Sequence, residues 1–177
     1  MRRLNLGSGT TKIKDTLNVD CNIDIKPDVV LDVSKPLPFL DEIFDEIYFF
    51  HCIEHIEKFK HYFVLKEIHR ILKLDGILYI SYPEFSEILK HWLANTNQDR
   101  KFWEATIYGR QSYEGDYHYS AMDSLELQEQ MANVGFKVLN TQKEPKQSFN
   151  TVMKVSRGAA TPLYEEVLYR EVFRPCQ

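Results

Sequence analysis

Two glycines near the amino terminus, Gly7 and Gly9, are spaced so that the backbone between them could hold a ligand. They follow the short apolar run at residues 3–6. Because neither carries a Cβ atom, the chain can turn sharply there and approach a bound group closely. A turn of this kind after a strand is typical of nucleotide sites. An ordinary tight turn is the alternative, since the Gly-x-Gly pattern also arises by chance.

Two carboxylates follow short apolar runs further along the chain. Asp20 comes after residues 16–19, and Asp32 comes after residues 28–31. In a doubly wound sheet, a carboxylate at the end of the second strand accepts hydrogen bonds from ribose hydroxyl groups. A carboxylate suits a diol because it accepts two hydrogen bonds, and burying it without a donor is costly. We therefore expect a hydroxyl-bearing ligand beside Asp20, with a turn or capping role as the alternative for both carboxylates.

Four titratable side chains could move a proton in such a site. His51 and His55 directly follow an apolar, strand-like run, and open α/β sheets place their ligands at the carboxyl ends of strands. Asp116 and His118 belong to an acidic and aromatic segment, residues 113–119, whose rings could stack on a substrate or cover a cation. The alternatives are exposed or core histidines in the first case and an aromatic packing cluster in the second.

The pentapeptide from His51 to His55 reads His-x-x-Glu-His, the motif of the inverted zinc peptidases. Such a site needs a helix through the motif and a third ligand further along the chain. Here the motif follows a strand-like run directly. We therefore expect no metal ion, and metal analysis would test that expectation.

Hydrophobic periodicity and helix breakers place the elements that must position these residues. Strands are predicted over residues 4–6, 17–20, 29–33, 44–50, 76–82, 136–141 and 151–156, and helices over 57–73, 84–95, 98–107, 124–135 and 162–173. Asn97 is the predicted cap of the third helix, Asp123 or Ser124 caps the fourth, and the pair Asp75-Gly76 ends the first. The first two crossovers are too short for a full helix, whereas the later strand–helix–strand order predicts a parallel sheet.

The size and composition of the chain indicate one globular domain of 177 residues. The formal net charge of −4 argues against nucleic acid as the main partner. The basic stretch at residues 137–157 is either a solvated edge or an anion site. No apolar run is long enough to span a membrane, and no signal sequence is expected. Three widely spaced cysteines, Cys21, Cys52 and Cys176, favour a reduced, cytoplasmic setting.

In their order along the chain, several of these pieces resemble the class I S-adenosyl-L-methionine (SAM)-dependent methyltransferases, in particular the small branch with a type-11-like methyltransferase domain. The matching segments are residues 4–9 for the glycine-rich first motif, 18–20 for the ribose-binding strand end, 32–39 for the adenine side, 44–56 for the fourth strand and its exit loop, 65–78 for the helix and turn before the fifth strand, and 124–138 for the late helix and strand. The resemblance covers residues 4–82 and 121–156.

This resemblance implies a Rossmann-like α/β fold, with a mostly parallel, seven-stranded sheet and shortened early crossover helices in a three-layer sandwich. The methyltransferase domain would span residues 1–160, and residues 161–177 would form a helical tail. SAM is the implied cofactor, with Gly7 and Gly9 beneath its methionine part, Asp20 at the ribose and Asp32 at the adenine amino group. The implied cofactor-binding set is Asn5, Gly7, Ser8, Gly9, Asp20, Asp32 and Val33.

By the same resemblance, the protein transfers a methyl group to a small polar acceptor, with a sugar or glycan precursor as one candidate. Methyl transfer from a sulfonium is an in-line displacement, for which the protein mainly supplies position. A catalytic base among His51, His55, Asp116 and His118 matters only if the acceptor is a hydroxyl or a protonated amine. The partner is then a small molecule, neither nucleic acid nor a membrane, and a homodimer is one option for the assembly.

Four features depart from the family pattern. Asn5 stands where the family has an acidic residue, the third glycine position is unfilled, and Leu74-Asp75 replaces a Pro-Gly turn. The clipped crossovers also remove the usual cover over the cofactor. A non-catalytic SAM-binding or protein-interaction module is therefore the alternative function, and the unfilled glycine position disfavours an NAD-dependent enzyme.

Overall fold

The computed structural model describes residues 1–94, 100–113, 115–144 and 149–158. Four expectations concern other parts of the chain and lie outside these residues: the cap at Asn97, the domain boundary at residue 160, the tail helix and Cys176. None of the helices in the described ranges combines the length and the apolar character that a bilayer span requires.

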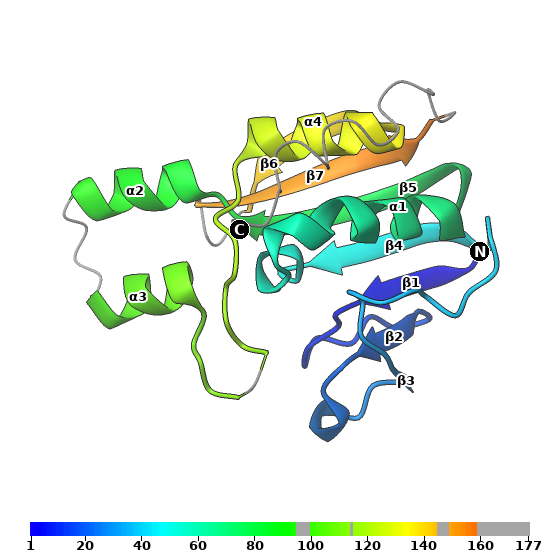
Figure 1. The fold of residues 1–177 in the computed structure, drawn as a ribbon, viewed down its shortest axis with the longest axis horizontal. Coiled ribbons are helices and arrows are strands. Elements are labelled where there is room, and N and C mark those ends of the chain that lie inside the picture. Colours follow the sequence, from blue (N-terminus) through cyan, green and yellow to red (C-terminus); the bar gives the residue numbers. More distant parts are fainter. Residues whose placement is uncertain (95–99, 114, 145–148, 159–177) are drawn as a thin grey trace, which may run out of the picture.

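The strands of the described residues form one sheet in the order β3-β2-β1-β4-β5-β7-β6 (Figure 1). The first five in this order run parallel, and β7 is antiparallel to both of its neighbours. The strands are β1 (Arg3–Leu6), β2 (Leu17–Asp20), β3 (Val29–Val30), β4 (Phe44–Phe50), β5 (Leu72–Pro83), β6 (Phe136–Lys143) and β7 (Asn150–Arg157). The expected Rossmann-like, mostly parallel, seven-stranded sheet is confirmed, and β1 lies where the strand order reverses.

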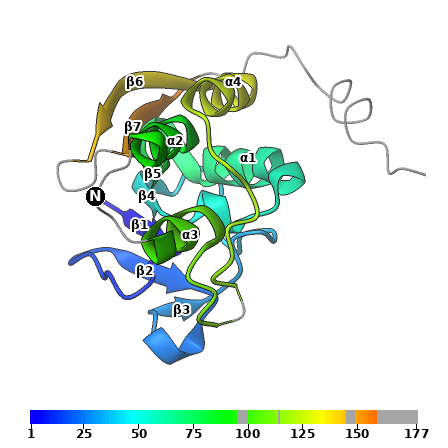
Figure 2. The same ribbon diagram turned by 90° about the vertical axis from the view of Figure 1, so that its left-hand side faces the viewer.

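Two helices, α1 (His61–Ile71) and α4 (Ser124–Val134), pack against each other on one face of the sheet (Figures 1 and 2). Strand residues alternate between the two faces of a sheet, and Ile47, Phe49 and Ile80 have no exposed surface in the resulting core. Burying a side chain of this size contributes about 1.5–3 kcal/mol. The apolar alternation of β4 and β5 is therefore what holds this helical layer in place.

The ends of α4 follow the local sequence. The Asp123 carboxylate accepts hydrogen bonds from the backbone N–H groups of Leu125 at 2.9 Å and Glu126 at 3.2 Å, which satisfies donors that the first helical turn leaves free. Gly135 then ends the helix with a φ of 104°, in the left-handed region that glycine adopts without strain. Both ends were predicted from the sequence, which left Asp123 and Ser124 as alternatives for the cap, and the structure shows that the cap is Asp123.

On the opposite face of the sheet, the described residues form no helical layer (Figure 2). The segments from β1 to β3 contain only the short 3-10 helix η1 (Ile23–Ile25), because a dozen or more residues are normally needed for a helical crossover. The stacked rings of Tyr48 and Tyr79, with centroids 5.3 Å apart, lie on this face beside the Arg3–Glu46 ion pair. The third layer of the expected sandwich is therefore not formed by the described residues.

A polar network, centred on the buried Asn18, takes the place of the first crossover helix. The Asn5 side-chain amide donates to Asn18 Oδ1 at 3.0 Å, and the Ile13 backbone N–H donates to the same oxygen at 2.9 Å. The Asn18 backbone N–H donates to Asp28 Oδ2 at 2.8 Å. These bonds hold the segment between β1 and β2 in one shape without a helix.

Two further helices, α2 (Phe85–Leu93) and α3 (Arg100–Tyr108), lie beyond the carboxyl ends of the parallel strands (Figure 1). They enclose a second, smaller core of Ile88, Trp103 and Phe149, with the Trp103 and Phe149 ring centroids 5.5 Å apart. The helix pair is thus anchored to the start of β7 and stands over the end of the sheet where ligands are expected.

The structure corrects several predicted boundaries. The helix predicted over 57–73 is a 3-10 turn, η3 (Lys58–Lys60), followed by α1, which ends at Ile71. It ends there because the buried Leu72 is already extended and pairs with Phe44 in the sheet, so Asp75-Gly76 lies inside β5. The third strand, predicted over 29–33, is only the two-residue β3, because Asp32 turns the chain by accepting a hydrogen bond from the Ser34 N–H.

Candidate active site

A cavity of about 870 Å³ opens at the carboxyl ends of β1, β4 and β5. Its walls come from the glycine turn after β1, the segment after β4, α3 and the loop that follows it. Of the predicted site residues, Asn5, Gly7, Ser8, Gly9, His51, His55, Asp116 and His118 line this cavity. The parallel strands therefore bring together residues that are up to 113 positions apart in the sequence, from Asn5 to His118.

The turn at Gly7 and Gly9 requires glycine for two different reasons. Both residues have positive φ, at 62° and 51°, a region that costs an L-residue about 1–2 kcal/mol. A Cβ atom on Gly7 would also lie 2.3 Å from Cys52 Sγ, whereas a Cβ on Gly9 would meet nothing within 4 Å. The backbone therefore passes close to the segment after β4 at Gly7 and faces open space at Gly9.

Asp20 lies under the glycine turn and does not line the cavity. Its Oδ2 accepts a hydrogen bond from the Gly9 N–H at 2.9 Å, and its Oδ1 accepts one from the Asn22 N–H at 2.9 Å. Asn22 itself lines the cavity. Because each carboxylate oxygen can accept a second hydrogen bond, Asp20 braces the turn while keeping acceptor capacity for a ligand.

Asp32 and Val33 are not brought into the cavity. Asp32 Oδ1 accepts hydrogen bonds from the Ser34 N–H at 2.9 Å and the Ser34 hydroxyl at 2.7 Å, and Oδ2 lies 3.4 Å from Lys35 Nζ. Partial burial opposes ionisation, but the bonds from Ser34 outweigh it and lower the Asp32 pKa. Val33 packs against the main core. In this conformation Asp32 has the turn role that the sequence left open as its alternative.

The wall after β4 consists of a left-handed turn at His51, with φ 48°, and a short 3-10 helix, η2 (Ile53–His55). His51 lies between two carboxylates, with Nδ1 3.4 Å from Glu54 Oε1 and Nε2 3.0 Å from Glu144 Oε1. Burial alone would lower the pKa of His51, but these two carboxylates outweigh it and raise the pKa to about 9. His51 therefore carries a positive charge at neutral pH and binds negative groups.

The loop after α3 brings His118 to η2. The His118 N–H donates to the Tyr108 carbonyl at the end of α3, at 3.0 Å, and the Tyr119 N–H donates to the Glu54 carbonyl at 2.8 Å. Gly109 makes this fold possible, since a Cβ there would lie 2.1 Å from the Asp116 carbonyl oxygen. Burial lowers the pKa of His118 below its usual 6.5, which favours the neutral ring at neutral pH.

Asp116, in the same loop, accepts hydrogen bonds from the Ser112 N–H at 3.1 Å and the Ser112 hydroxyl at 2.6 Å. Partial burial works against ionisation, but these bonds outweigh it and lower the Asp116 pKa. Asp116 is thus a charged carboxylate at the edge of the cavity, suited to contact a cation more than to accept a proton.

The lining residues that sequence reasoning missed include Asn22, Glu54, Arg110 and Glu144. Glu54 was visible in the motif around His51, and Asn22 follows Asp20 closely enough to have been considered. Glu144 carried no signal, because it is the single acidic residue in the basic stretch at residues 137–157, which was interpreted as a solvated edge or an anion site. Its contact with His51 joins residues 93 positions apart, a distance that only the fold can close.

Comparison with known proteins gives a family and a fold. A family model described as a methyltransferase domain matches residues 11–141. No curated protein matches the chain. A SAM-dependent methyltransferase from Methanosarcina mazei has a similar structure, with a TM-score of 0.65 and 16% identity, covering 89% of this chain and 92% of that one.

Two other solved structures share the fold, with similar TM-scores and sequence identities. A Burkholderia thailandensis 1,6-didemethyltoxoflavin-N1-methyltransferase, with its substrate and S-adenosylhomocysteine bound, has a TM-score of 0.59 and 19% identity, covering 89% and 71% of the two chains. A chain from a complex of the Haloferax volcanii Trm112 activator with a methyltransferase has a TM-score of 0.60 and 14% identity, covering 89% and 83%. At identities this low, the structural similarity establishes a shared fold and no shared substrate.

Proposed function

The chain belongs to the methyltransferase-domain family and has the fold of the class I SAM-dependent methyltransferases, and on this premise we propose that it transfers a methyl group from SAM to a small polar acceptor. The observation that carries the proposal is the position of the Gly7–Gly9 turn. It lies at the carboxyl end of β1, where the strand order reverses, and it borders the cavity. Open α/β sheets bind their ligands in this crevice.

The residues present suit SAM by size and by charge. A volume of about 870 Å³ lies in the usual range for small-molecule sites. Glu54, Asp116 and Glu144 give the cavity carboxylates that attract a cation, and Phe50 and Tyr113 add aromatic surface. Asn22, together with the remaining acceptor capacity of Asp20 beneath it, suits a ribose diol.

When bound, SAM supplies a methyl group on a positively charged sulfur. We assign the protein the task of holding donor and acceptor in line, which accounts for most of the catalysis in a displacement of this kind. The turn at Gly7 and Gly9 would hold the methionine part from below. The loop after α3 would cover the reacting groups from the other side with Asp116 and His118. The polar side chains among the lining residues favour a hydroxylated acceptor such as a sugar or glycan precursor.

The test is calorimetry of the full chain with SAM, with S-adenosylhomocysteine and, as a specificity control, with NAD. We expect binding of the first two and none of the third. A turnover screen over sugars, sugar phosphates and other small polar acceptors, read as S-adenosylhomocysteine release, then identifies the acceptor. Failure to bind either adenosyl compound overturns the proposal.

A second function is supported by the open face of the sheet around Tyr48 and Tyr79. Burial and the neighbouring Glu46 raise the Tyr48 pKa to about 12, and Lys154 Nζ lies 5.7 Å from the Tyr79 ring centroid. A mixed aromatic and charged surface of this kind suits a protein partner, and one structural neighbour is part of a complex with an activator protein. SAM binding without turnover on any acceptor would favour such a non-catalytic interaction module.

A further inference from the structure

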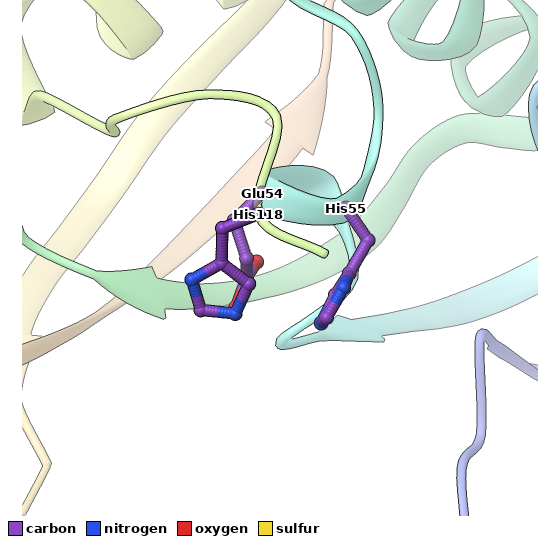
Figure 3. A group of neighbouring side chains, drawn as sticks. All are labelled: Glu54, His55 and His118. Carbon is purple, nitrogen blue, oxygen red and sulfur yellow. The ribbon is translucent and has the colours of Figure 1, made fainter. Parts of the chain in front are cut away.

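Three side chains that metal ions commonly use converge in the cavity: Glu54 and His55 from η2, and His118 from the loop after α3. One ligand atom from each lies within 4.8 Å of the others, and Figure 3 shows the three side chains extending to the same side of the ribbon. We propose that Glu54, His55 and His118 bind a divalent transition-metal ion, and that this ion holds the oxygen atoms of the methyl acceptor.

The carboxylate of Glu54 is the first independent argument. Its side chain is 2% exposed, and Oε2 accepts no hydrogen bond from any group in the part of the chain that the structure describes. A buried polar atom without a partner is costly, and more so when it is charged. A cation bound by Oε2 would remove that cost.

His55 is oriented as metal-binding histidines usually are, with one ring nitrogen bonded to the protein. His55 Nδ1 lies 3.0 Å from the Tyr117 carbonyl oxygen, which can only accept, so Nδ1 carries the proton and Nε2 is a bare ligand atom. The His118 ring lies near the backbone of Thr106. The two rings meet edge to face, with centroids 4.7 Å apart.

The backbone fixes these groups before any ion arrives. Ile53, in the same 3-10 turn as two of the ligands, has no exposed surface and anchors η2 in the core. The bond from the Tyr119 N–H to the Glu54 carbonyl ties the third ligand's loop to that turn. A site held by the main chain in this way is pre-organised, as tight metal binding requires.

This arrangement differs from the zinc-peptidase motif that the sequence spells. That motif would use His51, Glu54 and His55 on one helix, whereas here His51 bonds to the carboxylates of Glu54 and Glu144. The third ligand that the sequence argument lacked is His118, 63 positions after His55. His51 instead supports the site by holding the second oxygen of Glu54.

The ligand set selects the kind of metal. Two imidazoles and one carboxylate suit Zn²⁺, Fe²⁺, Co²⁺ or Mn²⁺, whereas Mg²⁺ and Ca²⁺ prefer oxygen ligands. Three protein ligands leave positions open for another molecule. All three side chains line the cavity, so the open positions face the space where the acceptor would lie.

The role of the ion rests on the proposed methyl transfer. A bound cation lowers the pKa of a coordinated hydroxyl. Because the ion has more than one open position, the best acceptor is a hydroxyl beside a second oxygen that can also bind the ion, such as a vicinal diol or a hydroxycarbonyl. The hydroxyl loses its proton to water, its oxygen forms a bond to the methyl carbon as the sulfur–carbon bond breaks, and the sulfur keeps that electron pair. The products are a methyl ether, a neutral thioether and a hydronium ion that carries the positive charge of the sulfonium, so charge and atoms balance.

The experiment uses the full chain, freed of metal by a chelator and titrated with Co²⁺. We expect one equivalent to bind with the visible absorption bands of a low-coordinate nitrogen and oxygen site, and Zn²⁺ to displace it. Glu54→Gln and His118→Gln should each weaken Co²⁺ binding by more than about 100-fold, beyond the 10–100-fold typical of residues outside the ligand shell. His69→Gln, a histidine on α1 away from the cavity, is the matched control and should bind as the wild type does.

His118 lies on a loop, so its substitution leaves the core intact, and far-ultraviolet circular dichroism checks that each variant is folded. Absence of Co²⁺ binding by the wild type, or wild-type Co²⁺ affinity in folded Glu54→Gln and His118→Gln, overturns the metal site. SAM binding is measured on the same metal-free protein. If Co²⁺ binds and SAM does not, the proposed function fails while the metal site stands; the opposite result rejects the metal site alone.

Discussion

At the scale of single residues, comparing substitutions of Gly7 and Gly9 distinguishes the cost of backbone strain from the cost of a steric clash. Both have positive φ, but only Gly7 faces another group at contact distance, the Cys52 side chain. We expect Gly9→Ala to lower the free energy of unfolding by about 1 kcal/mol from strain alone. Gly7→Ala should lower it by about 2–4 kcal/mol, because overpacking adds to the strain.

Urea unfolding of the two variants measures this difference. The double variant Gly7→Ala/Cys52→Ala is the internal control, because it removes the sulfur atom and should recover part of the loss. Equal losses for Gly7→Ala and Gly9→Ala would show that the contact with Cys52 is not tight in solution.

The two carboxylates predicted to bind SAM make a second test at this scale. Asp20 braces Gly9 and Asn22 at the cavity, whereas Asp32 bonds to Ser34 outside it. Asp20→Asn replaces one acceptor oxygen by a donor facing a backbone N–H, at a cost of about 1–3 kcal/mol, and we expect SAM affinity to fall at least about tenfold. Asp32→Asn should change it by less than about twofold. Calorimetry with SAM measures both affinities. A larger loss of affinity for Asp32→Asn than for Asp20→Asn would indicate that Asp32 contacts the adenine.

At the scale of elements, the segment between β1 and β2 depends on Asn18. Asn18→Ala would leave the Ile13 N–H and the Asn5 amide without their acceptor. Each unpaired buried donor costs about 1–3 kcal/mol, so the free energy of unfolding should fall by about 2–4 kcal/mol. Asn140→Ala, on the exposed side of β6, is the matched control and should stay within about 0.5 kcal/mol of wild type. A loss below 1 kcal/mol for Asn18→Ala in urea unfolding would contradict this account.

The packing of α1 against the end of the sheet predicts a pH dependence. His69 donates from Nε2 to the Gly158 carbonyl at 3.3 Å and packs edge to face on Phe136. Burial first, and the nearby Arg157 second, lower its pKa below the usual 6.5. The unfolded chain therefore binds the proton more readily, so this stabilisation is present above pH 6.5 and is lost as the pH falls through the lowered value.

Urea unfolding between pH 7.5 and 5 checks the sign. Wild type should lose stability towards pH 5, and His69→Gln, which keeps a donor but does not titrate, should show a flatter profile. A steeper profile for His69→Gln would mean that the charged form of His69 is the one favoured in the folded protein.

At the scale of the whole molecule, a ligand in the cavity would join segments from three parts of the chain: the glycine turn, η2 and the loop after α3. At 100 times its Kd, SAM should raise the free energy of unfolding by about 2.7 kcal/mol. Hydrogen exchange should slow at the glycine turn and also at the amides of His118 and Tyr119, which tie the loop to α3 and η2. Slower exchange at the glycine turn alone would show that the loop takes no part in binding.

The sequence predicted those features that have local causes. Asp123 and Gly135 mark the ends of α4 because capping and left-handed turns depend on neighbouring residues. The end of α1 at Ile71 was missed because it depends on Leu72 pairing with Phe44, a tertiary contact that overrides the turn signal of Asp75-Gly76. Glu144 beside His51 was missed for the same reason, since nothing nearby in the sequence records which strand lies across the cavity.

The first crossover has one further consequence. Residues 9–16 are mostly exposed and are held by hydrogen bonds to Asn18 and Asn5, with little apolar burial. Opening this segment would uncover little surface, and the sensitivity of a conformational opening to denaturant scales with the surface uncovered. The amide of Ile13 should therefore exchange at a rate nearly independent of low urea concentrations, while amides of β4 and β5 respond steeply. The ligand-binding end of the molecule could then rearrange under conditions that leave the rest of the sheet unchanged.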